Sequence, residues 1–219
     1  MVVADFSLWG DILQEYITIL ENSTAEYSEK HSRFIAIVQH CESEAQAAEL
    51  ILGIKSKYWD ARHNVYAYVL QNGTVRFSDD GEPHGTAAKP ILDVIQGSDV
   101  TDVLITVTRY FGGTLLGTGG LVRAYSTSAR DALNLAQRVQ MCPCLELEVC
   151  CDYSDYEPLS KLISRCGGIP QDTDFTEKVK IDFIIKESAH DDFIHKLTET
   201  FFGKIKAKVQ KELFFPIKL

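Results

Sequence analysis

The chain has 219 residues, of which 45% are apolar and 24% are charged, and this composition excludes a disordered polypeptide. No apolar run approaches the roughly 18 residues of a membrane-spanning helix, and the N-terminus lacks the basic start of a secretory signal, so we expect a cytoplasmic protein without membrane contact. The formal net charge of −9 excludes a general polyanion binder and leaves only a local basic patch for nucleic acid.

The first part of the chain has the pattern of a mixed α/β domain. Five β-rich runs are predicted, at residues 14–20, 32–40, 64–70, 75–77 and 102–110. Three helices are predicted, at residues 42–59, 87–96 and 121–139. The polar residues between the first two β-rich runs suit a hairpin-like connection, and Ser43 with Gln46 has the spacing of a capping box.

The second part of the chain has a different order of elements. Strands are predicted at residues 145–151, 169–175, 178–186 and 204–215, with helices at residues 156–166 and 189–202. This βαββαβ order is typical of a ferredoxin-like domain. Pro143 interrupts the helical pattern before it, so we expect an α+β protein with two domains, residues 1–140 and 141–219.

The six cysteines do not have the spacing of a metal site. No C-x-x-C occurs, and Cys142 with Cys144 has no matching His or Cys pair at zinc spacing. Without a secretion signal we expect reduced thiols, no metal and no cofactor.

Titratable residues gather in the acidic loop, residues 78–87, which has the sequence SDDGEPHGTA. Asp80 and Glu82 are candidates for general acid/base catalysis, and His84 is a weaker one. Acids at these spacings do not match an EF-hand. The alternative is a capped turn that leads into a helix, with Thr86 near the N-cap.

Five glycines lie within the glycine-rich segment, residues 112–120. Its spacing fits neither a Walker A loop nor a dinucleotide fingerprint. Gly119 and Gly120 open the following helix, where free N–H groups and the helix dipole favour an anion. Arg109, Arg123 and Arg130, with hydroxyls on the same helix face, would complete a phosphate cradle. The alternative is that the acidic loop neutralises these arginines and the glycines serve close packing.

Lysines alternate with apolar residues near the C-terminus. Lys204, Lys206 and Lys208 would share one face of a strand, as Lys178 and Lys180 would on another. The first strand of a ferredoxin-like sheet lies between the third and the fourth, so its two glutamates, at positions 146 and 148, can pair with these lysines. The alternative is that the two glutamates cannot neutralise all five lysines, so that one face of the sheet stays positively charged and can bind RNA.

Four segments within residues 30–136 closely resemble the IMPACT/YigZ family: KHSRFIAIV, WDARHNVYAYVL, SDDGEPHGTAAKPIL and VTRYFGGTLLGTGGLVRAYSTSARDAL. The length is similar to that of the two-domain bacterial, YigZ-type members. The resemblance implies a ribosomal-protein domain-2-like α/β domain followed by a ferredoxin-like domain similar to the last domain of elongation factor G. The family's motif positions map onto Arg33, Phe34, His63, Asp79, Asp80, Glu82, Lys89, Arg109, Tyr110, Arg123 and Arg130.

Three hypotheses follow. The first is a non-enzymatic RNA- or ribosome-associated protein linked to regulation of translation, whose partner is the ribosome or structured RNA. The second is an enzyme that acts on a nucleotide or other phosphorylated small molecule, in a cleft between the acidic loop and the glycine-rich segment. The third is a scaffold with an internal salt-bridge network. The residues expected to bind an anion or nucleic acid are Arg33, His63, Lys89, Arg109, Gly119, Gly120, Arg123 and Arg130.

Overall fold

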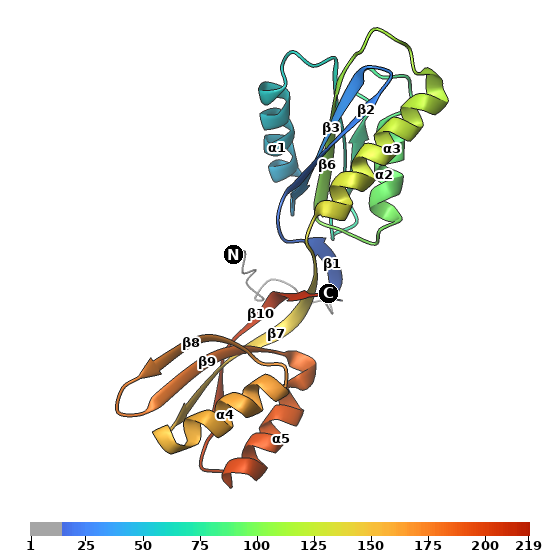
Figure 1. The fold of residues 1–219 in the computed structure, drawn as a ribbon. Helices are drawn as coiled ribbons and strands as arrows, with labels where there is room; N and C mark the ends of the chain where they lie inside the picture. Colours follow the sequence, from blue (N-terminus) through green and yellow to red (C-terminus); the bar gives the residue numbers. More distant parts are fainter. Residues whose placement is uncertain (1–14) are drawn as a thin grey trace. The chain divides into compact units, whose positions relative to one another are not determined.

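A computed structural model describes residues 15–219, which divide into two compact units: residues 16–140 with 218–219, and residue 15 with 141–217 (Figure 1). Gln14, at the start of the first predicted strand, lies outside the described residues. Both units combine a β-sheet with helices, as the α+β prediction requires.

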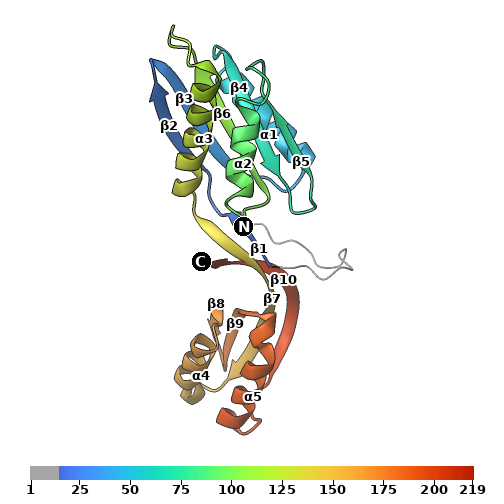
Figure 2. The same cartoon turned by 90° about the vertical axis from the view of Figure 1, so that its right-hand side faces the viewer.

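The first unit is an antiparallel sheet covered on both faces. Its elements are β1 (Tyr16–Ile19), β2 (Ser23–Glu29), β3 (Ser32–His40), α1 (Glu44–Lys57), β4 (His63–Val69), β5 (Val75–Ser78), α2 (Ala88–Gln96), β6 (Val103–Tyr110) and α3 (Gly117–Leu135). The five-stranded sheet has the order β2-β3-β6-β4-β5. Helices α2 and α3 lie on one face and α1 lies on the other (Figures 1 and 2).

The main core of this unit lies between the sheet and the helices α2 and α3. The central strand β6 is buried along seven consecutive residues because both of its faces are covered. Phe34 of β3 meets Tyr125 of α3 edge to face, with ring centroids 5.2 Å apart. The predicted cap of α1 is confirmed, since the Ser43 side chain accepts a hydrogen bond from the Gln46 N–H.

The connection predicted for residues 21–31 is wrong, because it contains a strand. Strand β2 pairs with β3 in register, from Ser23 opposite Val38 to Glu29 opposite Ser32. Its residues alternate between half-buried and exposed, as expected for an edge strand of which only one face is covered. Because most residues of β2 are polar, its sequence does not show the alternation of apolar and polar residues by which a strand is predicted.

The second unit has the ferredoxin-like fold that the element order predicts. Its elements are β7 (Arg138–Cys151), α4 (Tyr153–Arg165), β8 (Ile169–Phe175), β9 (Val179–Lys186), a 3-10 turn (Glu187–Ala189), α5 (His190–Phe201) and β10 (Ala207–Lys218). Strand β7 lies between β9 and β10, with β8 beyond β9, and also pairs with the short β1. The core joins this sheet to α4 and α5.

Several predicted boundaries are wrong: the helix predicted to end at 139 ends at Leu135, the helix predicted to begin at 156 begins at Tyr153, and three further differences affect the glycine-rich segment, the domain junction and the lysines. Helix α3 begins at Gly117 instead of 121, so its first turn consists largely of glycine. Strand β7 begins at Arg138 instead of 145 and passes through Pro143. Strand β10 begins at Ala207, so Lys204 and Lys206 precede it, although burial still alternates along this segment.

Gly112 shows what one glycine of the glycine-rich segment is for. A Cβ built there would lie 2.0 Å from the carbonyl carbon of His31, in the turn between β2 and β3. That turn has two residues, Lys30 and His31, both with positive φ. Gly112 also donates its N–H to the Ser32 Oγ, at 3.2 Å. The glycine therefore lets two loops of the same unit approach each other.

We predict that Gly112→Ala destabilises the protein by about 1–3 kcal/mol, because the added methyl group collides with backbone that cannot move freely. Thermal and urea unfolding measure the change. Gly119→Ala is the matched control, since a Cβ there meets nothing within 4 Å. The control should raise stability by roughly 0.5–1 kcal/mol through helix propensity. Equal effects of the two substitutions would contradict this account of Gly112.

Candidate functional site

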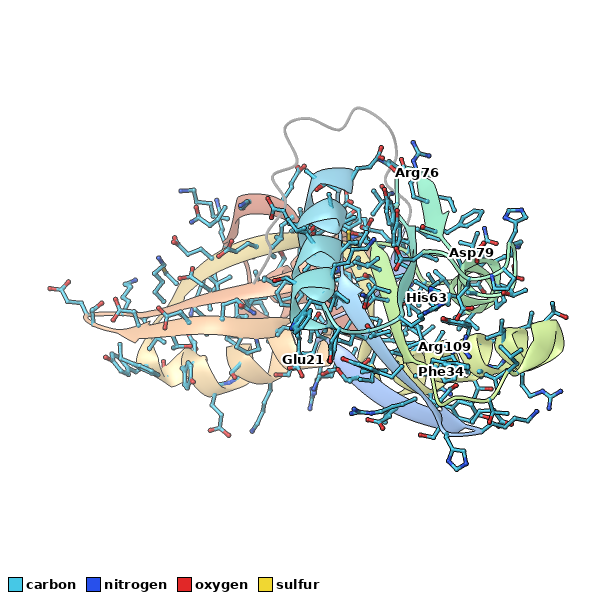
Figure 3. All side chains as sticks on the ribbon, turned by 90° about the horizontal axis from the view of Figure 1, so that it is seen from above. Glu21, Phe34, His63, Arg76, Asp79 and Arg109 are labelled. Atoms are coloured by element: carbon cyan, nitrogen blue, oxygen red, sulfur yellow. The ribbon has the colours of Figure 1, made fainter. Side chains whose placement is uncertain are left out.

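Three neighbouring strands place Phe34, Arg109 and His63 in one row across the sheet. Arg109 of β6 is directly opposite Phe34 of β3 on one side and His63 of β4 on the other. Residues opposite each other share a face of the sheet. The Arg109 guanidinium lies 5.4 Å from the centroid of the Phe34 ring and 5.6 Å from that of Phe111. Figure 3 labels this row together with Asp79 of the adjacent acidic loop.

The carboxylate of Glu82 completes this row. Its Oε1 lies 2.6 Å from Arg109 Nη1, and both side chains are almost fully buried, with exposed fractions of 3% and 6%. The Tyr125 hydroxyl of α3 donates to the same oxygen at 2.9 Å. His63 Nε2 is 3.8 Å away. Burial and the Glu82 charge together raise the pKa of Tyr125, so its hydroxyl stays protonated as a donor.

The tautomer of His63 follows from its second contact. Its Nδ1 lies 2.8 Å from the carbonyl oxygen of Asp80. Because a carbonyl can only accept, Nδ1 carries the proton. In the neutral ring Nε2 is therefore the acceptor nitrogen, on the side of Glu82.

The two aspartates of the acidic loop have structural contacts instead. Asp79 accepts hydrogen bonds from the N–H groups of Gly85, Ala87 and Ala88, and so caps the start of α2. Asp80 adopts a left-handed conformation with φ of 47°. The capped turn that the sequence left as an alternative is present, with Asp79 as its acceptor.

Asp80 is held in place by an ion pair and a backbone donor. Its carboxylate lies 2.8 Å from Lys55 Nζ and accepts the Asn64 N–H at 2.7 Å. Burial alone would raise the pKa of Asp80, but the Lys55 and Asn64 contacts outweigh it and lower that pKa below its ordinary value.

A pocket of about 450 Å³ opens beside the buried ion pair. Its lining combines charged, apolar and helix-terminal residues: Arg62, His63, Glu82, Pro83, Arg109, Phe111, Leu115, Leu116, Gly117, Thr118 and Leu121. The acidic loop and the glycine-rich segment thus border one pocket. We call it the α3 pocket.

The start of α3 reaches this pocket through Gly117 and Thr118 rather than through Gly119 and Gly120. Gly119 is exposed, and a Cβ on Gly120 would lie 3.0 Å from Leu116 Cβ. Phosphate binding at Gly119 and Gly120 stays a prediction. The residues of α3 that line the pocket come about half a helical turn before these two glycines.

The other predicted anion-binding residues lie outside the α3 pocket. Arg123 and Arg130 are exposed on α3, and the structure gives neither of them an ion-pair partner among residues 15–219. Arg130 borders a separate pocket of about 300 Å³ beside α2. Arg33 pairs with Glu26 at 2.6 Å on the exposed side of the sheet. Lys89 pairs with Asp93 on α2.

The lysines of the second unit divide into two groups. Lys178 pairs with Asp152, and Lys180 lies 2.8 Å from Glu148, which lowers the pKa of that carboxyl. The other group is exposed and forms no ion pair within the described part of the chain: Lys204, Lys206 and Lys208. The predicted cross-strand pairing therefore accounts for Lys180. The charge of Lys208 also helps to lower the pKa of Glu148, although the two form no ion pair, so Lys204 and Lys206 are the lysines that this pairing does not involve within the described chain.

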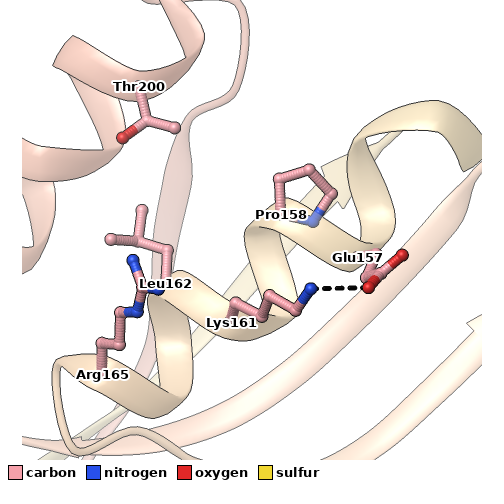
Figure 4. A pocket seen from close by; sticks show the side chains of 6 residues that line it. All are labelled: Glu157, Pro158, Lys161, Leu162, Arg165 and Thr200. Atoms are coloured by element: carbon pink, nitrogen blue, oxygen red, sulfur yellow. Dashed lines mark hydrogen bonds and ion pairs between the residues drawn. The ribbon is translucent and has the colours of Figure 1, made fainter.

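A third pocket, of about 380 Å³, lies between α4 and α5 (Figure 4). Lys161 there is ion-paired with Glu157 at 2.6 Å. Arg165 is exposed but belongs to the last turn of α4, where the helix dipole already attracts a cation.

No group of three or more His, Cys, Asp or Glu side chains within residues 15–219 is arranged to hold a metal ion. Over the same residues, no helix combines the length and apolar character that crossing a membrane requires.

The fold and the site together define a class of protein: an α/β domain with a buried Arg–Glu pair beside a helix start, followed by a ferredoxin-like domain. The family model for the Impact N-terminal domain matches residues 30–133, and the model for a domain of unknown function (DUF1949) matches residues 149–204. The chain belongs to the IMPACT family.

Relatives match along most of the chain. The IMPACT family member YvyE of Bacillus subtilis is 33% identical over 88% of this chain and 90% of its own length. The IMPACT family member YigZ of Escherichia coli is 33% identical over 78% of this chain and 85% of its own. A solved structure, described as the crystal structure of an hypothetical protein, is 30% identical, with a TM-score of 0.59 over 90% of this chain and 97% of that one.

Several residues that line the α3 pocket, or that contact its lining, carry no signal in the sequence. Tyr125 belongs to the apolar stripe of α3, and nothing in that stripe marks its hydroxyl as a partner of Glu82. Arg62 and Phe111 lie in loops, and only the closure of the sheet brings them to one pocket. Thr118 is not predicted to lie in a helix, because α3 begins earlier than the periodicity of its apolar residues indicates.

We predict that Glu82→Gln lowers the free energy of unfolding by roughly 3–5 kcal/mol, because it leaves the buried Arg109 charge uncompensated. Unfolding in urea measures the change. Glu26→Gln is the matched control, since its ion pair with Arg33 has the same 2.6 Å separation but is exposed. Solvent screening should make the destabilisation in the control much smaller. Similar destabilisation in both variants would contradict the importance of burial.

We predict that Asp80 stabilises the fold in a pH-dependent manner. Its pKa is about 3.9 in an unfolded chain and lower in the folded one, so its contribution is complete above about pH 4 and disappears as the pH falls through the folded pKa. The stability difference between wild type and Asp80→Asn should therefore be constant from about pH 7 to 5 and shrink at lower pH. Asp99→Asn is the control, since Asp99 also has a positive φ but is exposed and forms no ion pair within residues 15–219. A difference that persists into strong acid would contradict the prediction.

Proposed function

We propose that this chain is a non-enzymatic cytoplasmic protein that associates with the ribosome or structured RNA and acts in the regulation of translation. The observation that carries the proposal is two groups of neighbouring exposed cations, none of which forms an ion pair within the described residues: Arg123 and Arg130 on α3, and Lys204, Lys206 and Lys208 in the second unit. In a chain with a net charge of −9, cations that remain unneutralised on a solvent-facing surface are where phosphate contacts can form.

Each unit supplies its own basic surface. Arg123 and Arg130 are two helical turns apart on α3, a spacing of one heptad that keeps them on one face. The three lysines of the second unit are exposed at alternate positions, with Ile205 buried between two of them. Alternate exposure presents successive charges in the same direction, as contact with a phosphate backbone requires.

The α3 pocket supports a second candidate, an enzyme acting on a nucleotide or another phosphorylated small molecule. Glu82 lines the pocket, and its Oε2 has no hydrogen-bond partner within the described chain, so it is available as an acid or base. Asp80 is less suited, because Lys55 and Asn64 occupy its carboxylate. Phosphorus NMR of a bound nucleotide or sugar phosphate distinguishes turnover from simple binding.

The first candidate is tested by co-sedimentation with ribosomes over a series of salt concentrations. Binding should weaken with salt, because phosphate contacts release counterions. Arg123→Gln with Arg130→Gln should reduce the slope of log affinity against log salt by about 0.7–0.9 for each phosphate that is no longer neutralised. The triple variant Lys204→Gln, Lys206→Gln, Lys208→Gln should do the same for the second unit.

The matched control removes charge from lysines that already have partners. Lys161→Gln with Lys196→Gln changes two exposed lysines that are each ion-paired to an acid one turn earlier. This control should leave the salt slope unchanged. Absence of a ribosome-bound fraction at low salt, or an equal reduction of binding in the control, would overturn the proposal.

A further inference from the structure

The α3 pocket has an excess of positive charge, although the chain as a whole is acidic. Glu82 is the only carboxylate among the described residues that line it, and Arg109 neutralises that charge at 2.6 Å. Arg62 also lines the pocket, is exposed and has no ion pair within residues 15–219. The balance favours an anionic ligand.

The start of α3 adds hydrogen-bond donors to this positive charge. Helix α3 has 19 residues, no acidic residue in its first turn and no side-chain cap. The N–H groups of Gly117 and Thr118, both in the pocket wall, have no hydrogen-bond acceptor in the described chain. Uncapped N–H groups at the positive end of a long helix dipole bind phosphate oxygens.

A buried donor in the same wall is also without a partner. The Arg109 side chain is 6% exposed, and its Nε is fully buried with no acceptor within the part of the chain described. An orphaned donor at such a site costs free energy in the unliganded protein.

The rest of the wall is apolar and suits a flat ring. Phe111 and Leu115 are exposed by 47% and 82%, and Leu116, Leu121 and Pro83 complete the surface. A volume of about 450 Å³ is in the range of small-molecule sites. Aromatic and apolar side chains stack nucleobases irrespective of sequence. The Oε2 of Glu82 offers an acceptor for a hydroxyl group of a sugar.

We propose that the α3 pocket binds a nucleoside 5′-phosphate, with the phosphate at Gly117, Thr118 and Arg62 and the base against Phe111 and Leu115. Two sources present this chemistry: a free mononucleotide and the 5′-phosphorylated end of an RNA. The second source rests on the proposed association with RNA, whereas the first does not.

The test is calorimetric titration of the full chain with adenosine 5′-monophosphate, adenosine and ribose 5-phosphate. The complete nucleotide should bind about ten-fold or more tightly than adenosine, which lacks the charge-assisted hydrogen bonds, and than ribose 5-phosphate, which lacks the stacked base. Competition by RNA oligonucleotides with a 5′-phosphate or a 5′-hydroxyl identifies the source. Selective competition by the 5′-phosphate form indicates an RNA end, and its absence indicates a free nucleotide.

Two variants probe the phosphate position without disturbing the core. Thr118→Glu puts a carboxylate at the helix start, where the helix dipole favours it but a bound phosphate is repelled. Arg62→Gln removes an exposed cation. Both should weaken binding of the nucleotide by about ten-fold or more while leaving the melting temperature of the free protein nearly unchanged. The matched controls are Asn134→Glu, near the other end of α3, and Arg165→Gln, in the pocket of Figure 4.

Nucleotide binding no tighter than adenosine binding would overturn the proposal, as would unchanged affinity in Thr118→Glu. Neither variant touches the exposed cations on which ribosome binding depends, namely Arg123, Arg130, Lys204, Lys206 and Lys208. Ribosome co-sedimentation of the same variants therefore reports on the proposed function separately, and a failure of one proposal is distinguishable from a failure of the other.

Discussion

A buried ion pair between Arg109 and Glu82 connects the parts of the first unit that make its site. Removing both charges from water is costly, and the pair is tolerated because its members are also hydrogen-bonded. Tyr125 donates to the shared carboxylate oxygen, and the Arg109 guanidinium lies over the rings of Phe34 and Phe111. One carboxylate thus links β6, the acidic loop and α3, and the α3 pocket is the space beside that junction.

The three carboxylates of the acidic loop are each engaged in local contacts. Asp79 caps α2, Asp80 pairs with Lys55, and Glu82 is enclosed with Arg109. None of these carboxylates forms an ion pair with the exposed Arg123 or Arg130 of α3 within the described residues. Net charge is therefore a poor guide to where this protein can bind an anion. An acid that is paired with a nearby cation has little electrostatic effect on an exposed cation farther away.

Most elements of the fold are predictable because their signals are local. Strands β8 and β9 and the capped start of α1 lie where alternation and capping place them. Strand β2 escapes prediction because an edge strand can be polar on its exposed side. The first turn of α3 escapes it because glycines carry no apolar period, and helix formation there depends on the rest of α3.

The sequence by itself determined the two-part order of elements, the ferredoxin-like arrangement of the second unit and the family. Only the tertiary structure decided which carboxylate meets which cation. Phe34, His63 and Arg109 are far apart in the chain and adjacent in the sheet, because strand pairing sets their register. The choice among three neighbouring acids depends on backbone at positive φ in Asp80 and Gly81, which turns Glu82 inward while its neighbours face other donors. Which of the three acids is buried depends on the cost of burying a charge and on the partners that other segments supply. A local sequence pattern contains no information about those partners.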